Sequence, residues 1–206
     1  MKRRALLVPL AALCLLPLAV AHAQGVALSA RDRADITRIE AYLNNLRTLR
    51  ARFLQIAPEG GLSEGTLWLQ RPGRMRFEYD PPTQLLLVAS GGNGLFYDKS
   101  LKQVSYFSLS TTPLGILLAE NIRLAGDVTV AGLHRLPGQI HVTMIRTRAP
   151  AEGSLTLVFA DDPLSLRQWS VIDAQQRETR VSLFKATLGG QFDQKLFDTA
   201  DPTLRE

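Results

Sequence analysis

One stretch of alternating side chains, residues 65–82, most restricts the folds open to this chain. Between Arg74 and Asp80 the large apolar residues fall at every second position, which is the repeat of a strand with one face away from water. Residues 65–71 alternate in the same way, and Pro72-Gly73 between the two segments is typical of a turn. The stretch predicts a β-hairpin whose apolar face carries Leu67, Leu69, Met75, Phe77 and Tyr79.

Further segments with strand character follow over most of the chain. They are residues 49–55, 84–89, 95–98, 103–109, 128–130, 139–147, 153–160, 166–173 and 179–184. Residues 84–89 are apolar at nearly every position, so we expect both faces of that strand to be covered. Gly91-Gly92-Asn93-Gly94 reads as a hairpin loop rather than a phosphate-binding loop, because no Gly-Lys-Ser/Thr follows it.

Two segments have helical character instead. Ser29 is a plausible N-cap with Asp32 three residues on, and an apolar stripe follows at spacings of three and four. The stripe consists of Ile36, Ile39, Leu43 and Leu46, and the opposite side carries Arg31, Arg33, Arg38, Glu40 and Asn44. Residues 112–120 place a proline at a first helical position. Large aliphatic residues follow it, namely Leu114, Ile116, Leu117 and Leu118.

A sheet of about ten or more strands must curl, and these two segments are available to cover its concave face. The sequence therefore predicts a mostly β fold. We expect a single curved antiparallel sheet that forms an incomplete β-barrel, covered by an N-terminal helix and a short mid-chain helix. An apolar lid over a concave sheet either completes an ordinary core or closes a cavity for an apolar ligand.

Residues 1–23 have the three parts of a secretory signal: a basic start, an apolar run and Ala21-His22-Ala23. The apolar run is shorter than the ~20 residues that a membrane-spanning helix needs. We expect cleavage after Ala23, which leaves residues 24–206 as a single domain. Cys14, the only cysteine, lies in the signal and follows Leu13, where a lipidation site has a small residue, so a lipid-anchored form is not expected.

Charge and motif content exclude several classes of function. Without Lys2, Arg3 and Arg4 the formal charge falls from +5 to +2, and the remaining basic residues are scattered, so nucleic-acid binding is not expected. His134 and His141 have no acidic partner at metal-ligand spacing, which favours surface or edge-strand histidines over a metal site. No serine lies in a G-x-S-x-G motif. We expect neither an enzyme nor a cofactor.

A set of short motifs runs in order along the chain: Phe53-Leu54-Gln55, Gly65, Leu67-Trp68-Leu69, Arg71-Pro72-Gly73-Arg74, Phe77, Tyr79, Pro82, Leu87-Val88-Ala89-Ser90, Tyr97-Asp98, Gln103-Val104, Thr112-Pro113-Leu114 and Leu117-Leu118. In these residues the chain resembles the periplasmic outer-membrane lipoprotein carrier family, the LolA family. Each motif is weak alone, but the ordered set covers the mature chain. The Gly91–Gly94 turn and the short connection from Ala57 to Glu64 depart from the family pattern.

The resemblance implies a monomeric carrier that holds the acyl chains of triacylated lipoproteins. An inner-membrane lipoprotein-releasing ABC exporter would load it, and it would deliver to an outer-membrane lipoprotein receptor. The cavity would be lined by Leu67, Leu69, Met75, Phe77 and Tyr79. The lid would carry Ile36, Ile39, Leu43, Leu46, Leu114, Leu117 and Leu118. Arg71 matches the arginine that ties the sheet to the lid in the closed form.

Two other functions stay open at this stage. A periplasmic lipid- or glycolipid-binding or sensing module of the same fold would use the cavity without passing cargo between membranes. A regulator of that kind usually carries a further partner-binding domain, for which residues 24–206 leave no room. A hydrolase is the third possibility, but the sequence offers no catalytic constellation for it.

Overall fold

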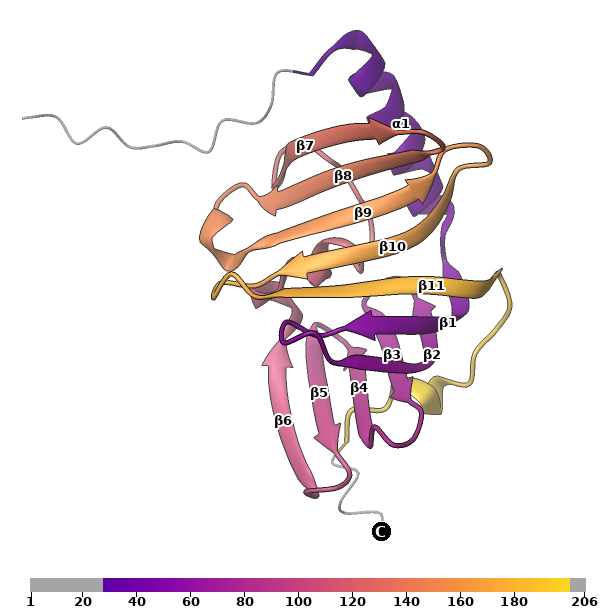
Figure 1. Ribbon diagram of the computed structural model, residues 1–206, viewed down its shortest axis with the longest axis vertical. Coiled ribbons are helices and arrows are strands. Elements are labelled where there is room, and N and C mark those ends of the chain that lie inside the picture. The colour runs from indigo at the N-terminus through magenta and orange to yellow at the C-terminus, as the bar shows by residue number, and fades with distance from the viewer. Residues whose placement is uncertain (1–27, 201–206) are drawn as a thin grey trace, which may run out of the picture.

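The computed structural model describes residues 28–200, so the expected signal sequence lies outside the described range. Eleven antiparallel strands form one sheet in the order β6-β5-β4-β3-β2-β1-β11-β10-β9-β8-β7 (Figure 1). The strands are β1 Thr48–Ile56, β2 Leu62–Gln70, β3 Arg74–Tyr79, β4 Leu85–Ser90, β5 Asn93–Asp98, β6 Gln103–Ser108, β7 Val128–Leu136, β8 Gln139–Arg146, β9 Ser154–Ala160, β10 Ser165–Ile172 and β11 Glu178–Leu188. β6 and β7 are the two edges, so the sheet is not closed into a barrel. The predicted mostly β fold with one large sheet is confirmed.

Two strands are longer than the sequence pattern predicts. β7 continues to Leu136 through Gly132, where its register with β8 shifts. β11 continues to Leu188, although its last residues are exposed and show no apolar alternation. Pairing with β1 extends β11, because Thr187 and Leu188 lie opposite Arg50 and Leu49.

Contacts between distant strands show how strongly the sheet curls. Phe77 on β3 and Trp169 on β10 have ring centroids 6.1 Å apart, although β2, β1 and β11 lie between their strands. Four strand spacings of ~4.8 Å would separate them by about 19 Å in a flat sheet. The sheet therefore bends until side chains on its concave face touch across it. We call the concave face of the sheet the inner face.

One α-helix, α1 Ala30–Asn45, lies across the strands β7–β10 (Figure 1). Its stripe of Ile36, Ile39 and Leu43 is buried in the same apolar cluster as the inner face, as predicted. Tyr42 packs edge-on against Phe159 of β9, with ring centroids 5.7 Å apart. The helix is therefore a cover on the concave side of the sheet.

Ser29 is the N-cap of α1, as predicted, and it forms a capping box with Asp32. The Ser29 hydroxyl accepts from the Asp32 N–H at 3.1 Å, and the Asp32 carboxylate accepts from the Ser29 N–H at 2.8 Å. Arg135 of β7 donates to the same carboxylate at 2.8 Å. Hydrogen bonds from Ser29, and then Arg135, lower the pKa of Asp32 from 3.8 to about 2.

This shift predicts an acid-sensitive contribution to stability. A carboxyl whose folded pKa is depressed stabilises the fold above its unfolded pKa, and that contribution is lost as the pH falls from about 4 towards 2. We expect urea midpoints of the wild type to fall in this window and those of Asp32→Asn to change less. Glu59→Gln, which removes an exposed carboxyl in a turn, is the control. Parallel curves for wild type and Asp32→Asn would contradict the assignment.

β4 is covered on both faces, as its unbroken apolar run predicts. Ala89 belongs to the inner-face cluster, whereas Leu86 and Val88 form a second cluster with Leu95 and Tyr97 of β5. On the outer side the C-terminal segment, with the 3-10 turn η4 Gln194–Phe197, lies along β3 and β4 (Figure 1). Gly91 and Gly92, with φ of 59° and 86°, form the predicted tight turn between β4 and β5.

The connection between the two edge strands has special importance. Residues 109–127 leave β6 at one edge of the sheet and enter β7 at the other. We call them the lid segment. The lid segment crosses the concave side of the sheet, because Ile116, Leu117 and Leu118 are buried in the same apolar cluster as the inner face.

Candidate functional site

The inner face of β2 and β3 carries the five residues expected to line a cavity. Leu67, Leu69 and Met75 are fully buried, and Phe77 and Tyr79 are 4% and 8% exposed. Cross-strand pairing places Leu67 opposite Phe77 and Leu69 opposite Met75. The structure therefore brings all five residues together on one apolar surface.

Phe53 of β1 completes an aromatic cluster on this surface. Its ring lies 4.9 Å from that of Phe77 and 5.1 Å from that of Tyr79, edge-on in both cases. Gly65 makes room for it, because a Cβ there would lie 2.7 Å from the Phe53 ring and 2.1 Å from the carbonyl oxygen of Glu78. A glycine is thus required at this point of β2.

Tyr79 carries the polar group of the cluster. Its hydroxyl donates to the side-chain oxygen of Gln55 at 2.8 Å, and burial raises the pKa of Tyr79 to about 12. The phenol is therefore neutral at physiological pH. It gives the apolar surface one satisfied polar contact and no charge.

The lid segment covers this surface, and the short mid-chain helix that the sequence predicts is present in it as 3-10 helix. It contains two short 3-10 turns, η1 Leu109–Thr111 and η2 Pro113–Ile116, and continues as irregular chain. The predicted short helix is therefore confirmed with Pro113 at its first position, although it ends at Ile116. Gly115 and the proximity of the Leu109 carbonyl favour tight turns over a regular α-helix.

The apolar side chains of the lid segment fill the concave side of the sheet. Ile116, Leu117, Leu118, Ile122 and Leu124 are all buried in the inner-face cluster. Leu114 is only partly buried and packs at the margin of this cluster. In this closed form, lid side chains occupy the space over the apolar surface.

Arg71, at the end of β2, joins the lid segment to the end of α1. Its guanidinium donates to the carbonyl oxygens of Leu43 and Leu46, the latter at 3.5 Å. It also donates to the carbonyl oxygen of Ala119 at 2.5 and 3.1 Å and to that of Glu120 at 3.3 Å. One side chain of the sheet thus holds both covering elements.

The charge of Arg71 is buried without a carboxylate partner among the described residues. The side chain is only 4% exposed, and all its hydrogen-bond acceptors are backbone carbonyls. Burial, and then the nearby charge of Arg47, lowers the pKa of Arg71 to about 10, so it remains charged at neutral pH. The last turn of α1 has no basic residue of its own, and Arg71 supplies a cation at the negative end of the helix dipole.

Two polar residues of α1 also bind the lid segment, which the sequence pattern did not indicate. The Asn44 amide donates to the Ile122 carbonyl oxygen and accepts from the Ile122 N–H, both at 2.9 Å. The Glu40 carboxylate accepts from the Leu124 N–H at 2.6 Å. Glu40 and Asn44 fall on the polar side of the helix, so periodicity groups them with solvent-facing residues. Only the path of the lid segment reveals their role.

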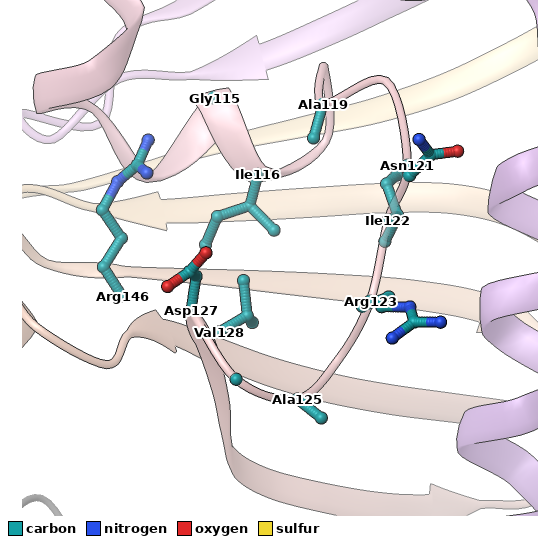
Figure 2. Close-up of a pocket in the computed structure, with 11 residues that line it drawn as sticks. Gly115, Ile116, Ala119, Asn121, Ile122, Arg123, Ala125, Asp127, Val128 and Arg146 are labelled. Atoms are coloured by element: carbon teal, nitrogen blue, oxygen red, sulfur yellow. The ribbon is translucent and has the colours of Figure 1, made fainter.

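A pocket of about 500 Å³ opens between the lid segment and the strands β7 and β8 (Figure 2). Ile116, Ile122 and Val128 supply apolar side chains, and Arg123, Asp127 and Arg146 are polar. This pocket does not include the five inner-face residues of β2 and β3, which lie behind the closed lid segment. It lies beside the lid rather than beneath it.

His134 lies on the edge strand β7, as expected, and His141 lies opposite it on the neighbouring strand β8. Burial, and then the neighbouring His134, lowers the pKa of His141. Between residues 28 and 200, no three His, Cys, Asp or Glu side chains are grouped so that they could hold a metal ion. Within the same range, none of the helices has both the length and the apolar character needed to cross a membrane.

Other proteins are similar in sequence to this chain over most of its length. A protein of Methylococcus capsulatus described as an outer-membrane lipoprotein carrier protein is 28% identical over 175 residues, which is 81% of this chain and 83% of that protein. A protein of Pseudomonas paraeruginosa with the same description is 29% identical over 189 residues, covering 86% and 89% of the two chains.

A solved structure and a family model agree with these relatives. The crystal structure of a putative outer membrane lipoprotein-sorting protein domain from Vibrio parahaemolyticus has the same fold, with a TM-score of 0.51 at 10% identity. It covers 84% of this chain and 97% of that one. The model of the family described as "Outer membrane lipoprotein carrier protein LolA" matches residues 44–200. Because that match spans most of the chain, the protein belongs to the outer membrane lipoprotein carrier protein LolA family.

Proposed function

We propose that this protein is a periplasmic carrier that binds the acyl chains of lipoproteins between the inner face of its sheet and the lid segment. The observation that carries the proposal is the position of Arg71, whose one guanidinium holds both α1 and the lid segment over an apolar surface. Breaking this set of contacts removes the one side chain that binds both covers at once. The inner-face residues are then the surface on which acyl chains bind.

The energetics require a cover that opens. An acyl chain of about sixteen carbons left in water costs on the order of 10 kcal/mol, at ~0.8 kcal/mol per CH₂. A carrier must supply an apolar surface for it and must also release it. In the closed form, Leu117 and Leu118 occupy that surface, so loading has to displace them. Part of the binding energy is consumed in this displacement, which keeps the affinity low enough for release.

Arg71 is suited to a contact that forms and breaks. A buried guanidinium paired only with neutral carbonyls is less stabilised than one paired with a carboxylate, because its full charge faces only partial charges. Its five N–H donors still reach carbonyls from two separate elements. Arg71 therefore serves as a latch, while α1 and the lid segment act as the lid.

The partners follow from the family. We infer that the cargo is a triacylated lipoprotein, that an inner-membrane lipoprotein-releasing ABC exporter loads the carrier, and that an outer-membrane receptor accepts the cargo. The relatives described as outer-membrane lipoprotein carrier proteins support this assignment. The carrier acts as a monomer in the periplasm and catalyses no reaction.

Replacing Arg71 with leucine is expected to favour the open, loaded state. The variant loses its donors to Leu43 and Ala119, so lid closure no longer competes fully with bound acyl chains. Native mass spectrometry of protein purified from periplasm should show more co-purifying triacylated lipoprotein than in the wild type, and transfer to a receptor should be slower.

The matched control is Arg180→Leu, which removes an exposed arginine paired with Glu178 on the sheet surface. It should load and release as the wild type does. Unchanged transfer by Arg71→Leu would contradict the latch. A co-purifying glycolipid or phospholipid, without lipoprotein, would indicate a lipid-binding module instead.

A further inference from the structure

A second arginine holds the beginning of the lid segment. Arg146, at the end of β8, donates from one terminal nitrogen to the carbonyl oxygens of Leu109 and Thr112, at 3.2 and 3.1 Å. These carbonyls belong to the turn η1 and to the residue that precedes η2. Figure 2 shows the guanidinium reaching from the strand towards the turn that contains Gly115.

Gly115 makes this contact possible. A Cβ at this position would lie 2.7 Å from the same terminal nitrogen of Arg146 and 2.4 Å from the carbonyl oxygen of Leu109. Its φ is not in the left-handed region, so backbone conformation does not explain the glycine. Close approach of the guanidinium and the Leu109 carbonyl does explain it.

Glu152 positions the arginine from the opposite side. Its carboxylate, in the turn η3 Pro150–Glu152, lies 3.2 Å from Nε of Arg146. The Nε edge of the guanidinium is therefore directed to the sheet side, and a terminal nitrogen is left for the lid. The two side chains are partly exposed, 29% for Arg146 and 32% for Glu152, but the two paired atoms are buried.

The two arginines hold different parts of the lid segment: Arg146 holds its beginning and Arg71 holds its middle. Arg71 reaches Ala119 and Glu120 from the β2 side of the sheet, whereas Arg146 reaches Leu109 and Thr112 from the β8 side. Arg71 is almost fully buried, but Arg146 lines the pocket beside the lid and is accessible from it. The contacts of Arg146 are thus the ones that solvent or an entering ligand reaches first.

We propose that Arg146 is a second latch residue, positioned by Glu152, and that the lid segment opens first at residues 109–118, where Gly115 and Ile116 line the pocket, before Arg71 releases Ala119 and Glu120. The proposal rests on the carrier function proposed above for the meaning of opening, but the opening itself is measurable without cargo. An acyl chain entering through the pocket meets Ile116 and Val128 before it reaches the inner face.

Hydrogen exchange of the cargo-free protein tests the order of opening. Two backbone hydrogen bonds near the Arg146 contacts report on the beginning of the lid segment. The Gly115 N–H donates to the Thr112 carbonyl oxygen at 3.1 Å, and the Leu117 N–H donates to the Leu114 carbonyl oxygen at 3.0 Å. At the far end, the Ile122 N–H donates to Asn44. In Arg146→Leu we expect exchange at Gly115 and Leu117 to accelerate on the order of tenfold, with Ile122 unchanged, since charged hydrogen bonds at one end are lost.

A second variant, Gly115→Ala, disturbs the same contact and keeps the charge of Arg146. Gly115→Ala should accelerate exchange in residues 109–118 in the same way, because its Cβ displaces the guanidinium and the Leu109 carbonyl. Arg146→Lys should give an intermediate rate, since an ammonium keeps the charge but not the fork of donors. Arg148→Leu, an exposed arginine two residues away, is the matched control and should have no effect.

The outcomes separate a latch from a purely structural role. Acceleration confined to residues 109–118 supports the proposal. Equal acceleration at the β1–β11 pairing, for example at Leu183, means that Arg146 only stabilises the fold, and unchanged exchange means that it holds nothing; either result overturns the proposal. Exchange can change locally while neither the wild type nor Arg146→Leu takes up lipoprotein from exporter-containing membranes. In that case the carrier function is contradicted, but the second latch is supported.

Discussion

Replacing Phe77 with alanine is expected to lower the free energy of unfolding by about 3–5 kcal/mol, the usual range for a buried aromatic. Phe77 is 4% exposed and contacts Phe53, Tyr79 and, across the curled sheet, Trp169. Its loss leaves a cavity and also removes a contact between two distant strands. Urea denaturation followed by tryptophan fluorescence measures the change, and Trp169 itself reports on the site.

Phe184→Ala is the matched control for this prediction. Phe184 lies on β11 with 36% exposure, so its truncation should change the free energy of unfolding much less. Equal losses for the two variants would mean that the aromatic contacts across the inner face contribute little. A smaller loss at Phe77 would show that the lid side chains collapse into the space it leaves.

Replacing Leu117 with aspartate should hold the lid open while the sheet remains folded. Leu117 is fully buried against the inner face, where its neighbours in the cluster are apolar side chains. The cost of burying an unpaired charge is several kcal/mol, so undocking the lid segment is the favourable response. We expect an apolar fluorescent dye to bind the variant at least tenfold more tightly than it binds the wild type.

Leu101→Asp controls for the added charge, because Leu101 is 64% exposed and lies in the turn between β5 and β6. It should bind no more dye than the wild type. Circular dichroism should show the same strand content in both variants. Loss of that content in Leu117→Asp would mean that the lid segment is part of the folding core and not a separable cover.

Local patterns predict much of this fold because they act over a few residues. Alternation places β2 and β3, and the capping box with its apolar stripe places α1. The end of β11 cannot be predicted from local patterns, because Thr187 and Leu188 are held by pairing with β1, more than a hundred residues earlier in the chain. The type of helix in the lid segment cannot be predicted from them either, because it depends on contacts with Arg146 and the Leu109 carbonyl.

The candidate site divides in the same way. The inner-face residues and the position of Arg71 follow from alternation and from resemblance to the family, and all of them lie together in the structure. The acceptors of Arg71, and the lid contacts of Glu40, Asn44 and Arg146, depend on the path of residues 109–127 across the sheet. No spacing in the sequence encodes that path. A single polar residue on a mostly polar helix face or strand end carries no signal of its partner.

The pairing of β1 with β11 has a consequence for folding. β1–β6 and β7–β11 are each a run of local hairpins, and β1–β11 is the only strand pairing that joins them. A chain that is synthesised from its N-terminus presents the first run, with its apolar inner face, long before β11 arrives. Pairing of β1 with β11 is the step with the largest sequence separation, so it is expected to be slow. Until this pairing forms, the folding chain exposes the kind of apolar surface that promotes aggregation.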